Sequence, residues 1–160
     1  REAVKEEALI DRMLSEGHVV GFHSMDHQNA MVRGYLHTRK DFRTGSEFMK
    51  RKGISDIWYR PPWGLTNLFS WHFVRKYGMK MVLWDVMAED WEKGATTGSI
   101  RKKCLSRVKD GSILCLHDGG RRTGGAPGAP EKTLEALTYV IPALKEAGCR
   151  FILPSEAVFR

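Results

Sequence analysis

Blocks of apolar and polar residues alternate along the chain and predict helices and strands in turn. Apolar residues recur at helical spacing over 3–16, and Gly17 follows as a residue that readily takes the left-handed conformation at a helix end. Short apolar runs bounded by polar residues predict buried strands. The predicted strands are 19–22, 57–60, 80–85, 112–116 and 150–153, and the predicted helices are 3–16, 38–52, 68–77, 99–109 and 131–147.

This order of elements predicts an α/β fold. Repeated strand–helix units form a parallel sheet with right-handed crossovers, as either a (β/α) barrel or an open doubly wound sheet. No G-x-G-x-x-G follows a predicted strand and there is no P-loop, which disfavours the nucleotide-binding versions. Five strands are too few for a closed barrel, and the chain opens on Arg1 inside a predicted helix. We therefore expect one domain over 1–160 that belongs to a longer polypeptide and is incomplete at its N-terminus.

Composition and charge narrow the function classes only a little. The chain has 160 residues, of which 42% are hydrophobic and 28% charged, which is typical of a soluble globular protein. No apolar run is long enough to span a membrane. The net charge of +7 is spread along the sequence, so we expect a solvated basic exterior and no nucleic-acid partner. The three cysteines are far apart, which argues against a disulfide framework, and Cys115 is expected in the core.

Two histidines directly follow the first apolar run. His23 and His27 are four residues apart, a spacing that puts both on one face of a helical turn and within reach of one metal ion. They would lie at the carboxyl end of a strand, where α/β folds place their chemistry. The simpler interpretation, that both histidines only cap a loop, stays open at this point.

Other polar groups follow the later predicted strands. Arg60-Pro61-Pro62-Trp63-Gly64 follows the second, Asp85 and Glu89-Asp90-Trp91 follow the third, and His117-Asp118 follows the fourth. Polar groups that converge on one end of a parallel sheet indicate an active site. The simpler alternatives are surface pairing for Arg60, core packing for Trp91 and a buried structural role for His117. Trp58, Trp71 and Trp84 fall inside predicted elements and are expected in the core.

Taken in order, these landmarks resemble the NodB-homology polysaccharide deacetylases of carbohydrate esterase family four. The matching segments are His23-Ser24-Met25-Asp26-His27, Arg60-Pro61-Pro62-Trp63-Gly64, Asp90-Trp91 and Leu114-Cys115-Leu116-His117-Asp118. The resemblance implies a distorted, incomplete TIM-like (β/α) barrel. It also implies a metal-dependent hydrolase that removes N-acetyl or O-acetyl groups from a carbohydrate polymer or oligomer. Candidate substrates are peptidoglycan, chitin-like oligomers, xylan and exopolysaccharide, and the family suggests a cell-envelope or extracellular location.

The resemblance also implies roles for individual residues. His23 and His27 would bind a divalent metal, most often zinc, and Arg60 would orient and tune the catalytic base. The metal would lower the pKa of a bound water, and His117 would protonate the leaving amine. The remaining implied substrate-binding residues are Trp63, whose backbone N–H would hold the oxyanion, Trp91, which would wall the acetyl pocket, and Pro62.

The chain departs from the family pattern at three places. No Thr-Phe-Asp-Asp motif, the source of the catalytic base and of a third metal ligand, precedes His23. Met87 stands where an acidic residue usually supports the catalytic histidine, so we expect either that Asp85 or Glu89 substitutes for it or that His117 is tuned differently. Cys115 stands where the family usually has leucine. Two alternatives to the hydrolase therefore remain, an inactive carbohydrate-binding relative and a metal hydrolase of a non-sugar amide.

Overall fold

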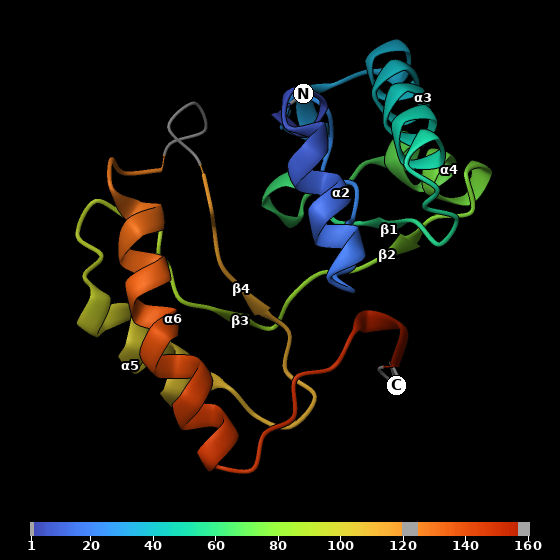
Figure 1. The fold of residues 1–160 in the computed structure, drawn as a ribbon. Helices are drawn as coiled ribbons and strands as arrows, with labels where there is room; N and C mark the ends of the chain where they lie inside the picture. Colours follow the sequence, from blue (N-terminus) through green and yellow to red (C-terminus); the bar gives the residue numbers. More distant parts are fainter. Residues whose placement is uncertain (1, 120–124, 157–160) are drawn as a thin grey trace. The chain divides into compact units, whose positions relative to one another are not determined.

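The computed structural model describes residues 2–119 and 125–156, which form two compact units, Arg1–Leu83 and Trp84–Arg160 (Figure 1). Parallel strands and helices alternate in both units, which confirms the predicted α/β class. The prediction of a single domain over 1–160 stays a prediction. We describe each unit by itself.

The first unit combines four α-helices with a short parallel sheet. Its elements are α1 (Glu2–Lys5), α2 (Glu7–Ser15), η1 (Ala30–Val32), α3 (Tyr35–Arg51), β1 (Trp58–Tyr59), η2 (Pro62–Gly64), α4 (Leu68–Lys76) and β2 (Lys80–Met81). Strands β1 and β2 are parallel, with Trp58 opposite Lys80. Helices α3 and α4 lie side by side (Figure 1). As predicted, glycines with positive φ follow the helices, with Gly53 at 74° and Gly78 at 61°.

The core of this unit is a cluster of aromatic rings. The Phe22 ring lies 5.5 Å from both Phe42 and Tyr59, and Phe42 lies 5.9 Å from Phe73. Gly45 of α3 packs directly on Phe22, because a Cβ atom at Gly45 would lie 2.3 Å from Cε2 of that ring. The glycine thus lets α3 approach the segment that leads into His23.

The second unit packs two helices beside another parallel pair. Its elements are β3 (Val86–Met87), α5 (Thr97–Arg107), β4 (Leu114–Cys115), α6 (Ala129–Glu146) and η3 (Pro154–Glu156). Strands β3 and β4 are parallel, with Val86 opposite Leu114. Helix α5 begins at a capping box between Thr96 and Ser99, which satisfies backbone N–H groups at its first turn. Cys115 is buried, as expected.

The predicted strands are longer than the strands in the structure. The segment 19–22 is reduced to one parallel bridge between Phe22 and Tyr59, because only Phe22 makes ladder hydrogen bonds. The predicted strand 80–85 is shortened to β2 at its first two residues, and β3, which pairs with β4, begins only after the predicted run. The segment 150–153 is irregular, with Phe151 and Ile152 exposed and no strand partner among the described residues.

The predictions about the barrel, the first helix, the tryptophans and membrane spans have different outcomes. The described residues form two separate two-stranded sheets, so a closed TIM-like barrel is not seen and barrel geometry stays a prediction. The predicted helix over 3–16 is interrupted at Glu6. Trp58 is buried as expected, whereas Trp71 is 49% exposed because it lies on the outer face of α4. None of the described helices combines the length and the apolar character needed to cross a bilayer.

Candidate active site

His23 and His27 lie together in a loop of the first unit. Their ring centroids are 4.9 Å apart with an interplanar angle of 73°. The predicted helical turn is wrong, because Ser24 and His27 have φ values of 66° and 49°, in the left-handed region. The loop nevertheless brings the two imidazoles side by side, which is the part of the prediction that matters for metal binding.

A backbone carbonyl fixes the protonation of one of these rings. Nδ1 of His23 lies 2.7 Å from the carbonyl oxygen of Arg60, so Nδ1 carries the proton and donates it. Nε2 of His23 is then the unprotonated nitrogen, the form that ligates a metal, and an outer hydrogen bond of this kind is usual for metal-binding histidines. The described residues contain no cluster of three or more ligand-type side chains. Imidazole nitrogen is nevertheless a donor that divalent metals such as zinc accept, and two imidazoles lie together here.

Asp41 of α3 fixes the histidine loop through hydrogen bonds. Its Oδ1 accepts hydrogen bonds from the backbone N–H of Met25 at 2.7 Å and from Oγ of Ser24 at 3.2 Å. Burial raises the pKa of Asp41, and the two hydrogen bonds only partly offset that rise. The sequence analysis missed this residue, although it lies on the same helical face as the buried Thr38 and Phe42.

The segment after β1 lies against the histidine loop. Pro62 is buried, and the Trp63 ring is 49% exposed and lies 4.5 Å from the His27 ring. Trp63 has φ of 54°. The Arg60 guanidinium donates from Nη2 to the carbonyl of Leu83 at 3.3 Å. The structure thus brings Arg60 and Trp63 to the histidine pair, and their catalytic and substrate-binding roles stay predictions.

The second unit holds a histidine against a buried carboxylate. Oδ1 of Asp90 lies 2.8 Å from Nδ1 of His117, and Oδ2 accepts from the His117 backbone N–H at 2.7 Å and from Oγ1 of Thr133 at 2.9 Å. Asp90 is fully buried. Burial by itself would raise the pKa of Asp90, but the hydrogen bonds from His117 and Thr133 outweigh it and the pKa is lowered. Asp90 is therefore ionised at neutral pH and holds the proton of His117 on Nδ1.

Asp90 is the supporting carboxylate that the sequence analysis sought elsewhere. Asp85 instead accepts from the backbone N–H of Ile113 at 2.6 Å. Glu89 pairs with Lys103 at 2.5 Å and Arg107 at 2.8 Å, and these cations lower the pKa of its carboxyl group. Neither side chain is held toward His117, so the expectation that one of them replaces the residue at Met87 is wrong.

Trp91 lies next to the same histidine. Its ring centroid is 4.7 Å from that of His117, in an edge-to-face arrangement, and the side chain is partly buried. The Trp91 carbonyl accepts from the N–H of Ala126 at 2.9 Å, which holds the segment before α6. A glycine-rich segment follows Asp118 in the sequence, and its residues 120–124 lie outside the described part of the chain.

Backbone strain is concentrated in these segments. Among the described residues, the non-glycine residues with positive φ are Ser24, His27, Trp63 and Glu89. Two belong to the histidine loop, one follows Pro62, and one directly precedes Asp90. Left-handed backbone at such residues costs about 1–3 kcal/mol each and is found where function requires a special geometry. This distribution therefore marks the same segments that the sequence motifs mark.

Residues 1–82 match the family model described as polysaccharide deacetylase. The chain belongs to the polysaccharide deacetylase family. It is 30% identical over 150 residues to a peptidoglycan-N-acetylglucosamine deacetylase of Bacillus cereus. The aligned residues cover 92% of this chain and 67% of that protein. The family relationship confirms the NodB-homology resemblance, and it supports a hydrolase that acts on carbon–nitrogen bonds.

Solved structures of the family share this fold. A crystal structure of a peptidoglycan N-acetylglucosamine deacetylase aligns with a TM-score of 0.82 at 27% identity, covering 95% of this chain and 68% of that one. An acetyl xylan esterase of Clostridium thermocellum, solved with a cobalt ion, aligns with a TM-score of 0.76 at 27% identity, covering 93% and 68%. The chain spans 67% of the length of that Bacillus cereus relative and 30% of the length of a peptidoglycan-N-acetylglucosamine deacetylase, PgdA, of Listeria monocytogenes.

Proposed function

We propose that this polysaccharide deacetylase relative removes N-acetyl groups from an amino-sugar polymer or oligomer. The observation that carries the proposal is the pair of buried Asp90 and partly exposed His117, in which an ionised carboxylate sets the orientation and tautomer of the histidine. Relatives named as N-acetylglucosamine deacetylases support the N-acetyl substrate. The similarity to an acetyl xylan esterase makes O-acetyl groups the second substrate class to test.

In this proposal His117 transfers the proton to the departing nitrogen. With Nδ1–H donated to Asp90, Nε2 is the nitrogen that takes up and releases a proton, and the Asp90 carboxylate stabilises the imidazolium. Amide cleavage needs a proton on the departing nitrogen, because an amide anion is too basic to leave. The Trp91 ring beside His117 offers an apolar wall for the methyl of the acetyl group.

The proposal gives His23 and His27 a divalent metal, with zinc as the first to test. A bound metal supplies a water of lowered pKa and polarises the acyl oxygen. The Arg60 carbonyl holds His23 in the ligating tautomer, and the Trp63 backbone N–H is assigned to the developing oxyanion. Catalytic zinc sites usually have three protein ligands, so we expect weak metal binding if these two histidines act alone.

One alternative function keeps the fold without the chemistry. A carbohydrate-binding relative would bind glycan and release no acetate. The same-fold hydrolase of a non-sugar amide is distinguished by its substrate.

The deciding experiment measures acetate release with zinc added. N-acetylglucosamine oligomers, acetylated xylan and a small acyl amide are compared as substrates, with bound metal determined on the same samples. His117→Ala should lower kcat on the order of 10²–10⁴-fold with metal retained, whereas His23→Ala should lose metal. His72→Ala, an exposed histidine of α4, is the matched control. Glycan binding without acetate release would replace the hydrolase with the inactive relative.

A further inference from the structure

An unusual group of exposed aliphatic side chains lies at the start of α3 and α4. Met31, Val32, Leu36 and Leu68 are 62%, 73%, 76% and 84% exposed. They are four of the five most exposed large hydrophobic side chains in the described residues, and the fifth is Leu134 of α6 at 69%. Isolated exposed leucines are common, but such a concentration in one region marks an interaction surface.

Hydrogen bonds join the two segments into one surface. Nδ2 of Asn67, the residue before Leu68, donates to the carbonyl oxygens of Ala30 at 2.6 Å and Arg33 at 3.0 Å, on either side of Met31 and Val32. The Tyr35 ring contacts the Phe69 ring at 5.7 Å, which brings Leu36 to the same end of α4. The exposed aliphatic residues are therefore neighbours on a rigid framework.

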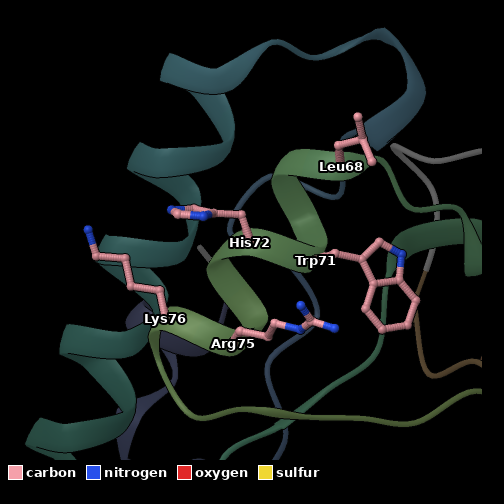
Figure 2. Close-up of a pocket in the computed structure, with 5 residues that line it drawn as sticks. All are labelled: Leu68, Trp71, His72, Arg75 and Lys76. Atoms are coloured by element: carbon pink, nitrogen blue, oxygen red, sulfur yellow. The ribbon is translucent and has the colours of Figure 1, made fainter.

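The surroundings of these residues are basic and contain no acidic residue in sequence. The chain has 19 acidic residues, yet none occurs over 27–40 or 57–84. Figure 2 shows the α4 part of this surface, with Leu68 at one end, Arg75 and Lys76 toward the other, and Trp71 between them. The apolar–basic patch is defined as Met31, Val32, Leu36 and Leu68 with the exposed cations Arg33, Arg39, Lys40, Arg75 and Lys76.

We propose that the apolar–basic patch docks on an anionic lipid surface. Aliphatic side chains enter the boundary between headgroups and acyl chains, while flanking lysines and arginines bind lipid phosphates. The charge of the patch fits such a partner, because the segments 27–40 and 57–84 that carry its side chains contain lysines and arginines and no acidic residue.

Two other partners fit less well. An acidic glycan could stack on the exposed Trp71 ring, but the four aliphatic side chains, which are the most exposed part of the surface, offer it little. A second copy would bring two basic faces together in a symmetric interface, and like charges oppose that contact. The docking is peripheral.

The test is co-sedimentation of the chain with vesicles. Vesicles of phosphatidylcholine alone are compared with vesicles that also contain phosphatidylglycerol, at low and high salt. We expect binding to the anionic vesicles only, weakened by salt because exposed charges are screened. The double variant Leu36→Ser/Leu68→Ser should lower the partition coefficient at least tenfold, and Arg75→Gln/Lys76→Gln should lower it and flatten the salt dependence.

Leu134→Ser is the matched control, because this leucine is equally exposed and lies in the second unit. It should leave vesicle binding unchanged, and circular dichroism should show all variants folded. Absence of binding to anionic vesicles would overturn the proposal, as would binding that the leucine variants leave intact. Light scattering provides a third test, because a wild-type dimer that Leu36→Ser/Leu68→Ser dissociates would assign the patch to self-association.

Discussion

Replacing Asp90 with asparagine tests the central pair of the second unit. The side chain keeps its size and loses its charge. Asp90 accepts three hydrogen bonds, two from His117 and one from Thr133, and an asparagine offers one acceptor oxygen and one donating NH₂ group. At least one donor is left facing another donor in a fully buried position.

The cost follows from this mismatch. An orphaned buried donor costs about 1–3 kcal/mol, and the remaining bonds lose their charge assistance, so we expect Asp90→Asn to lower the free energy of unfolding by about 2–4 kcal/mol. If the oxygen stays on the His117 backbone N–H, the amide nitrogen faces Nδ1 and moves the imidazole proton to Nε2. A wrong tautomer of a catalytic histidine lowers kcat on the order of 10²–10⁴-fold.

Three measurements check this reasoning. Urea unfolding gives the stability change, ¹⁵N NMR of His117 gives the tautomer, and acetate release gives kcat. The pKa of Asp90 is lowered in the folded state, so its stabilising contribution is present above the ordinary aspartate pKa of about 4 and is lost as pH falls through the lowered value. The urea concentration at the midpoint of wild-type unfolding should decrease as pH is lowered through that range, and the Asp90→Asn variant should show no such decrease. The account would be refuted if Asp90→Asn left both the urea midpoint and the His117 tautomer the same as in the wild type.

Further predictions concern the first unit. Asp41→Ala should cost about 1–3 kcal/mol and loosen the histidine loop, because Met25 N–H loses its acceptor, whereas Asp41→Asn keeps an acceptor and should cost less in urea unfolding. Gly45→Ala should destabilise by about 1–3 kcal/mol despite better helix propensity, because its methyl meets the Phe22 ring; a raised Tm would contradict this packing. His27→Ala should reduce zinc binding measured by calorimetry, and full retention of zinc affinity would remove it as a ligand.

Helix positions follow closely from the sequence, and strand lengths do not. Gly53 and Gly78 end their helices because the required left-handed backbone suits glycine, a local property that a sequence displays. Strand formation depends on a neighbouring backbone, which the apolar run 150–153 does not find among the described residues. Local signals therefore predicted helix ends better than strand pairing.

The candidate site was likewise predicted only where the signal is local in sequence. The histidine spacing predicted the ring pair, but no residue type announces positive φ at Ser24. Asp90 was recognised as part of a motif, yet its role depends on Thr133, which lies 43 positions later in the chain. Asp41 was missed because its partners lie in the loop and not on its own helix.

The left-handed backbone at Ser24, His27, Trp63 and Glu89 has a consequence for evolution and engineering. Glycine or asparagine at these positions would relieve conformational strain, so mutation toward greater thermal stability is open at the segments to which we assign the chemistry. A lineage that no longer needs the reaction gains stability by such changes and loses the site as it does so. Selection of this chain for heat resistance alone would follow the same route, and would yield robust proteins without an enzyme's geometry.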